Sequence, residues 1–178
     1  YLYTGTGSSL DIDNGIDLNG EGGLVWIKAR NNARSHALFD TERGANLLAS
    51  NLTAAQFGSS GMSANSDGFT VVDNSVNKVN ETIVSWTFRK APGFFDIVTY
   101  TGDGTTNRSI PHNLGSVPGF VVIKKPSEVS NWSAIARTAA DTYKGGGTSY
   151  AFGFNTTEWT TGSTYTAANS VGTSTNLL

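Results

Sequence analysis

The sequence contains one pattern twice, and this internal repeat constrains the fold more than any other feature. Four short segments recur in the same order, 95 to 97 residues further along: 3–7 as 100–104, 23–28 as 119–124, 69–70 as 165–166, and 74–76 as 169–171. A repeat of this period predicts two similar structural units in tandem. We therefore expect a first domain over residues 1–97 and a second domain over residues 98–178.

Each copy is expected to fold into short β-strands. Residues 24–28 and 120–124 are compact apolar runs, too short for a helix, and each follows a glycine. Residues 82–88 alternate between two faces, as a half-buried strand does. Turn-forming residues recur roughly every 8 to 15 positions, which is typical of sandwiches and jelly rolls. The sequence therefore predicts an all-β chain, in which residues 41–52 and 134–143 leave room for a helical turn.

The second copy is expected to lack its final strand. In the first copy this strand is centred on Trp86, and a counterpart 96 residues further along would fall past Leu178. A sandwich without one strand has an open edge with unpaired backbone groups. We expect either that the chain is a segment of a longer polypeptide or that a neighbouring subunit completes the sheet. The opening at Tyr1, without a methionine or a secretory signal, indicates either a processed chain or a piece of a longer one, and the missing strand favours the second.

Charge, cysteine content and hydropathy exclude several classes of protein. The net charge is −2, so no field of the whole chain attracts nucleic acid. The chain has no cysteine, which excludes disulfides and cysteine-based zinc sites. No apolar run approaches the ~20 residues that a membrane helix needs, so we expect no membrane insertion.

Three segments resemble virion proteins of marine tailed phages, cyanophages in particular. Residues 23–44 resemble a repeat found in those proteins, residues 84–102 resemble the joint between two repeats, and residues 110–124 resemble the entry to the second repeat. The resemblance covers nearly the whole chain. It implies two tandem concanavalin-like or LamG-like jelly-roll repeats, the second incomplete, in a tail fibre or related appendage. It implies no catalytic residues.

The resemblance also implies partners and a location. A chain of this kind would be a structural component on the surface of the phage particle, outside the host cell. It would assemble with other virion proteins and with copies of itself as a homo-oligomer, and it would contact a host-surface polysaccharide. Two alternatives remain open. One is a bacterial extracellular lectin-like adhesion or filament module, and the other is a glycan-cleaving enzyme, suggested by fold analogy alone.

The four tryptophans bear on sugar binding, because exposed aromatic rings stack on sugar rings. Trp26 and Trp86 lie within apolar strand patterns, so we expect both to pack in the core. Trp132 and Trp159 lie in polar segments, beside Asn131 and Glu158 respectively. We therefore name Trp132, Asn131 and Trp159 as candidate ligand-binding residues.

An acidic segment near the start of the chain faintly resembles a calcium loop. Asp11, Asp13 and Asp17 alternate around a glycine, and calcium takes oxygen ligands from alternate positions of such loops. The glutamate usual at the twelfth position is absent, because Gly22 stands there. The competing interpretation is a polar turn between strands. No cofactor other than calcium is indicated.

Three arginines flank the expected second strand. Arg30, Arg34 and Arg43 lie close to Asp40 and Glu42 in the sequence. One interpretation is a salt-bridged surface that contributes little to stability. The other is a contact between subunits, because arginine is favoured at interfaces.

No catalytic constellation emerges from the sequence. Ser35, His36 and Asp40 could be written as a triad, but adjacent residues of a strand point to opposite faces, so Ser35 and His36 would not meet. His112 lies in a turn signature. No pair of carboxylates stands out as the acid and nucleophile of a glycosidase. We therefore expect a non-enzymatic protein.

Overall fold

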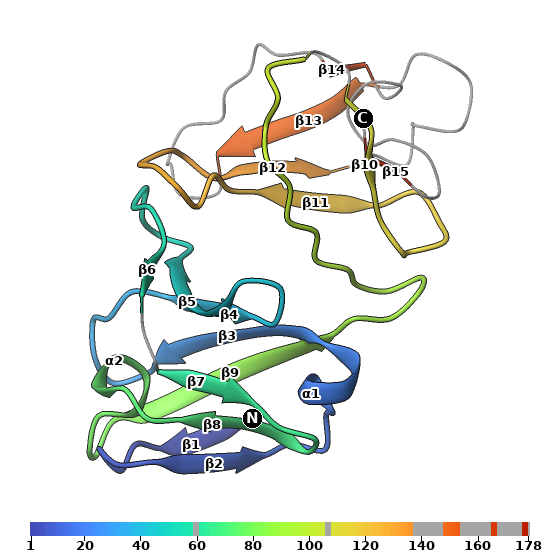
Figure 1. Ribbon diagram of the computed structural model, residues 1–178. Coiled ribbons are helices and arrows are strands. Elements are labelled where there is room, and N and C mark those ends of the chain that lie inside the picture. The colour runs from blue at the N-terminus through green and yellow to red at the C-terminus, as the bar shows by residue number, and fades with distance from the viewer. Residues whose placement is uncertain (59–60, 106–107, 137–147, 154–164, 167–175, 178) are drawn as a thin grey trace. The chain divides into compact units, whose positions relative to one another are not determined.

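The computed structural model describes residues 1–58, 61–105, 108–136, 148–153, 165–166 and 176–177 (Figure 1). All strand pairings among them are antiparallel, and their helices are two single turns, α1 (Leu18–Glu21) and α2 (Asn74–Asn77). The all-β class is therefore confirmed. The helical turn predicted within residues 41–52 is wrong, because a strand occupies residues 44–49. None of the described helices is long and apolar enough to cross a membrane.

The chain divides into two compact units. The first comprises Tyr1–Lys90 with Pro126–Val129, and the second comprises Ala91–Lys125 with Ser130–Leu178. The boundary between the units thus follows Lys90. The boundary that we expect after residue 97 was inferred from the period of the sequence repeat. It stays a prediction.

The first unit consists of two antiparallel sheets (Figure 1). The larger sheet has the strand order β1-β9-β3-β4-β5-β6, and the smaller has the order β2-β8-β7. The strands of the larger sheet are β1 (Leu2–Thr4), β9 (Thr82–Arg89), β3 (Gly23–Ala29), β4 (Ala37–Asp40), β5 (Gly44–Ala49) and β6 (Phe57–Gly58). Those of the smaller sheet are β2 (Leu10–Asp13), β8 (Gly68–Val71) and β7 (Met62–Ala64).

Both sheets contribute side chains to one apolar core. Burial along β3 alternates strictly, with Val25 and Ile27 on the buried face, as the two-residue period of a strand requires. Ile12 and Phe69 of the smaller sheet belong to the same cluster as these two residues. The first unit is therefore a two-layered structure with its core between the sheets, and the other face of β3 points away from that core.

Gly5 lies where two backbone segments come very close. Its amide donates to the carbonyl of Glu81 at 2.9 Å, and the amide of Asn80 donates to the carbonyl of Gly5 at 3.0 Å. A Cβ atom at this position would overlap the carbonyl oxygen of Lys78. Glycine is therefore required here for close approach, and it holds the end of β1 against the start of β9.

The second unit contains a four-stranded sheet and a separate two-stranded pair. The larger sheet has the order β11-β12-β13-β14, and β10 pairs with β15. The strands are β10 (Ile110–Pro111), β11 (Phe120–Ile123), β12 (Ser133–Ala136), β13 (Thr148–Gly153), β14 (Tyr165–Thr166) and β15 (Asn176–Leu177). Residues 134–136, at the start of the other predicted helical turn, thus belong to strand β12, and residues 137–143 lie outside the described part of the chain.

The hairpin of β11 and β12 repeats the register of β3 and β4. In the first unit Leu24 lies opposite Asp40, and in the second unit Phe120 lies opposite Ala136. Phe120 stands 96 residues after Leu24, and Ala136 stands 96 residues after Asp40. The three following pairs of the two hairpins differ by the same 96 residues. Residues that correspond in the sequence repeat therefore occupy corresponding places in the two hairpins.

Candidate functional site

Two tryptophans lie opposite each other on the outer face of the larger sheet, which is the face turned away from the core of the first unit. Trp26 of β3 is paired in register with Trp86 of β9. Their ring centroids are 5.9 Å apart and the rings are edge-on, at 65°. Trp86 is 45% exposed and Trp26 is partly buried. The expectation that both pack in the core is therefore wrong, because Val25 and Ile27 occupy the buried face of β3.

His36 extends this pair of rings into a row of three. The indole Nε1 of Trp26 donates to Nδ1 of His36 at 3.0 Å, and the two ring centroids are 5.7 Å apart. Burial, followed by the charge of Lys28, lowers the pKa of His36. Because Nδ1 accepts a hydrogen bond, the neutral ring carries its proton on Nε2. We call Trp86, Trp26 and His36 the aromatic row.

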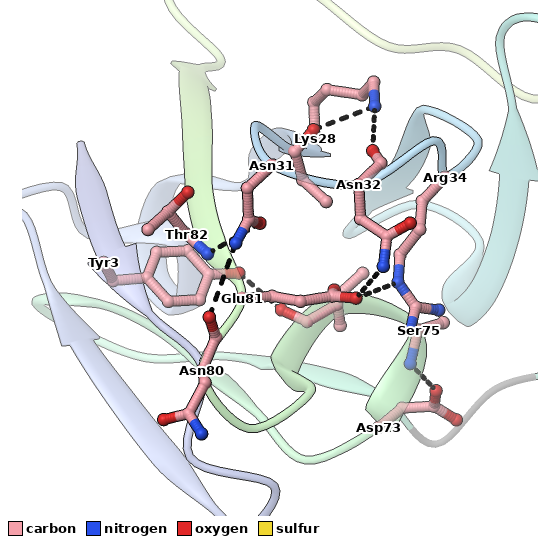
Figure 2. A network of polar contacts seen from close by, with 12 residues as sticks. Tyr3, Lys28, Asn31, Asn32, Arg34, Asp73, Ser75, Asn80, Glu81 and Thr82 are labelled. Atoms are coloured by element: carbon pink, nitrogen blue, oxygen red, sulfur yellow. Dashed lines mark hydrogen bonds and ion pairs between the residues drawn. The ribbon is translucent and has the colours of Figure 1, made fainter.

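A polar network lies at the Lys28 end of the same strand (Figure 2). The Nζ atom of Lys28 donates to the carbonyl oxygens of Ala29, at 2.8 Å, and of Asn32, at 3.2 Å. The side chains of Asn32 and Arg34 both donate to Oε1 of Glu81, at 2.9 and 2.7 Å. The network therefore ties the loop after β3 to the residue that precedes β9.

Glu81 is the centre of this network. Its side chain is almost buried, with the residue 5% exposed, and its Oε2 atom has no hydrogen-bond partner among the described residues. Burial raises the pKa of the Glu81 carboxyl, but the hydrogen bond and charge of Arg34 and the hydrogen bond from Asn32 outweigh it and hold the pKa below its usual value. The carboxylate is therefore ionised at neutral pH, and its partners suit a structural role.

A second pair of contacts reinforces the same loop. The amide of Thr82 donates to Oδ1 of Asn31 at 3.1 Å, and the amide of Arg30 donates to the carbonyl of Thr82 at 2.7 Å. Figure 2 shows Asn31, Asn80 and Thr82 grouped beside Glu81. These contacts thus join the loop that follows β3, which leads to His36, to the start of β9.

The whole chain, residues 1–178, matches the family described as a domain of unknown function, DUF7483. The chain belongs to the DUF7483 family. No curated protein and no solved structure matches it.

The three candidate ligand-binding residues of the second unit have different outcomes. Trp132 is 6% exposed, so the expectation of an exposed ring is wrong. It stands two residues before Ala134 on the same face of an extended segment, and Ala134 is fully buried. Asn131 is exposed, and Trp159 lies outside the described residues. Ligand binding by these three residues stays a prediction. The buried Trp132 ring no longer supports it, because stacking on a sugar needs an exposed ring.

Two of the three candidate contact arginines are engaged within the first unit. Arg34 pairs with Glu81, as described above. Arg43 is nearly buried, and its Nε donates to Oδ2 of the buried Asp40 at 2.6 Å. Arg30 has an exposed side chain. Of the three arginines, Arg30 is thus the one whose position best suits a contact between subunits.

The acidic segment has a structural explanation. Oδ1 of Asp11 accepts a hydrogen bond from the Thr70 hydroxyl at 2.6 Å, and Oδ1 of Asp17 accepts one from the amide of Gly20 at 2.7 Å, which caps α1. Asp13 is exposed at the end of β2. No group of three or more histidine or acidic side chains in the described part of the chain is placed to hold a metal ion. The interpretation as a polar turn fits these contacts better than a calcium site.

The residues that could be written as a triad do not form one. Nδ1 of His36 is occupied by the Trp26 indole, and Asp40 pairs with Arg43. His112 is buried, and its Nδ1 accepts from the amide of Leu114 at 3.2 Å, within a turn. These contacts hold side chains in place, and they do not activate a nucleophile.

Proposed function

We propose that this chain is a non-catalytic structural and binding module of a tailed-phage virion appendage, such as a tail fibre. In this proposal the chain consists of two tandem concanavalin-like jelly-roll sandwiches, and its first unit binds a host-surface glycan through the aromatic row. The observation that carries the binding function is the row itself, with an exposed tryptophan on the outer face of the larger sheet.

The chemistry of the aromatic row suits a sugar. The faces of indole rings stack on the C–H faces of pyranoses, and Trp86 is 45% exposed. His36 carries a proton on Nε2, and Lys28 uses two of its three donors within the chain. Hydrogen-bond donors are thus available beside the rings, where they can bond to sugar hydroxyls.

The carboxylates that form ion pairs in the first unit favour a binding module over a glycosidase. Glu81 and Asp40 are buried against arginines, and Glu42 pairs with Lys90 at 2.6 Å. A glycosidase needs two carboxylates facing one sugar, and one of them must have a raised pKa. The pKa of Glu81 is lowered instead. The placement of the module in a virion is supported by the resemblance of its three segments to phage virion proteins.

A glycan-array experiment tests the binding function. We expect the purified chain to bind bacterial surface polysaccharides, and Trp86→Ala to weaken this binding about tenfold, since loss of one stacked ring costs about 1.4 kcal/mol. Phe94→Ala removes another exposed aromatic ring, in the second unit, and serves as the matched control. Binding that is equally strong in Trp86→Ala, or the absence of binding to any glycan, contradicts the role of the aromatic row.

The location is tested separately on purified phage particles that encode the chain. We expect mass spectrometry to detect it in the particles, and a cryo-EM map to place it in a tail appendage. A chain that is expressed during infection but absent from the particles would refute the virion assignment.

A further inference from the structure

Lys28 lies directly beside the aromatic row. The pairing of β3 with β4 reaches Ile27 opposite Ala37, and continuing the same antiparallel register by one residue places Lys28 opposite His36. Side chains two residues apart on a strand point to the same face and lie about 7 Å apart. Lys28 and Trp26 therefore share the outer face of the larger sheet, and His36 is the neighbour of both.

The strand on the other side of β3 completes this arrangement. In the pairing of β3 with β9, Lys28 lies opposite Val84 and Trp26 lies opposite Trp86. Positions that are diagonal across two paired strands are about 7 to 8 Å apart, which is within reach of long side chains. A sugar ring that stacks on Trp86 is therefore within reach of the Lys28 ammonium group.

Lys28 forms no ion pair within the described part of the chain. Its Nζ atom is held by two main-chain carbonyl oxygens, which are neutral. The carboxylate of the adjoining network, Glu81, is bonded to Arg34 instead. The charge of Lys28 also reaches the aromatic row, because it adds to the effect of burial in lowering the pKa of His36. The aromatic row therefore has a cationic end.

The second copy has the lysine without the aromatic row. Lys124, the counterpart of Lys28, donates through Nζ to the carbonyl of the next residue at 2.8 Å, as Lys28 does. Val122 and Trp132 stand at the places of the Trp indole and the imidazole on β3 and β4, and Trp132 is buried. The lysine and its main-chain bond thus belong to the repeat, whereas the combination of the lysine with the aromatic row is a feature of the first unit.

We propose that the aromatic row binds an acidic pyranose, a uronic acid unit of a polysaccharide, and that Lys28 selects it over a neutral sugar. The sugar ring stacks on Trp86, and its carboxylate accepts hydrogen bonds from Nζ of Lys28 and Nε2 of His36. The inference rests on the proposed glycan binding and adds the class of sugar to it.

The chemistry of the two donors favours a carboxylate. Nζ of Lys28 retains one donor beyond its two bonds to carbonyl oxygens, and Nε2 of His36 makes no hydrogen bond within the part of the chain that the structure describes. A carboxylate can accept from both donors with its two oxygens, and hydrogen bonds to ionised groups are about twice as strong as neutral ones. A neutral hexose carries a hydroxymethyl group at the same ring position and offers no charge to Lys28.

The binding of matched oligosaccharides to the full chain tests the inference. The probes are tetrasaccharides of galacturonate and of mannuronate, each compared with its methyl ester, which keeps the rings and removes the charge. We expect the chain to bind at least one acid about tenfold more tightly than its ester at about 50 mM salt. This preference should disappear at about 500 mM salt, because the charge is then screened. Isothermal titration calorimetry measures the affinities.

Three variants separate Lys28 from the general charge of the chain. Lys28→Gln should abolish the preference for the acid and leave the affinity for the ester within about twofold, which also shows that the variant is folded. Lys28→Arg keeps the charge and should retain at least part of the preference. Lys124→Gln is the matched control, because it removes the corresponding lysine of the second unit, and it should leave the preference unchanged.

The outcomes distinguish this inference from the proposed function. Equal affinity for acid and ester in the unchanged chain overturns the inference and leaves glycan binding by the aromatic row in place. A preference that persists in Lys28→Gln, or that Lys124→Gln removes equally, overturns the assignment to Lys28. Binding of neither form also overturns the inference, and the glycan array with Trp86→Ala then decides separately whether the row binds neutral sugars.

Discussion

The hairpins β3–β4 and β11–β12 share a register but not an environment. Every pair in the second hairpin is the counterpart of a pair in the first, 96 residues further along. Yet Ile27 is buried, and Ile123, the same residue type at the corresponding place, is only partly buried. The comparison shows that the same local sequence pattern gives the same register in both hairpins, whereas the depth of burial depends on the surrounding structure.

The largest expected effect comes from truncating the two isoleucines. Ile27→Ala should lower the free energy of unfolding of the first unit by about 2–5 kcal/mol, because a fully buried side chain leaves a cavity. Ile123→Ala should cost the second unit less than about half of that, because part of its side chain already contacts water. Urea denaturation, with hydrogen exchange to distinguish the units, measures both. Equal losses would break the comparison.

The second effect concerns the carboxylate at the centre of the network in the first unit. Glu81→Gln removes the charge that Arg34 and Asn32 bond, and we expect it to cost about 1–2 kcal/mol. The position 96 residues further along is Leu177, so the second unit has no equivalent carboxylate there. Glu42→Gln is the matched control, since its partly exposed pair with Lys90 should contribute less than about 0.5 kcal/mol. Similar losses in the two variants would show that Glu81 is no special support.

The smallest effect is the dependence of the first unit on pH. Because burial and Lys28 lower the pKa of folded His36, the unfolded chain takes up its proton first as pH falls below 6.5. Stability present at pH 7 is therefore lost as pH falls from 6.5 through the folded pKa, and Glu81 adds a separate loss below 4.5. Calorimetry from pH 7.5 to 5 measures the first slope.

A variant of His36 provides the control for this slope. His36→Gln keeps an acceptor for the Trp26 indole without a group that titrates in this range, so the slope above pH 5 should flatten. Position 132, the counterpart of His36, is tryptophan, so the second unit has no titrating group at this place in the repeat. A slope that persists in His36→Gln would assign it to another group.

The sequence predicted the all-β class and the strands at residues 24–28 and 82–88, because the strand period and the repeat are local signals. The prediction failed for residues 44–49. They include a short Asn-Leu-Leu segment, and so short an apolar segment is equally compatible with a strand and with a helical turn. It also assigned Trp26 to the core. An apolar run with large side chains on both faces does not reveal which face is buried, and that is decided by packing against the smaller sheet.

The candidate site was harder to predict than the fold. Glu81 meets Asn32 and Arg34 across 49 and 47 residues of sequence, so no local pattern reveals the network. The repeat could have predicted the burial of Trp132. It stands 96 residues after His36, which is partly buried beside Trp26, and the repeat therefore placed it next to a strand rather than in an open loop.

The two Tyr-Thr-Gly motifs have unequal freedom to change. Gly5 lies in close contact with the backbone around Lys78, so any side chain there would push β1 away from β9. Gly102, its counterpart, has no described atom within 4 Å of where a side chain would begin. A cysteine for a fluorescent label or a surface anchor is thus best introduced at position 102, in a chain that has no other cysteine to compete for the reagent.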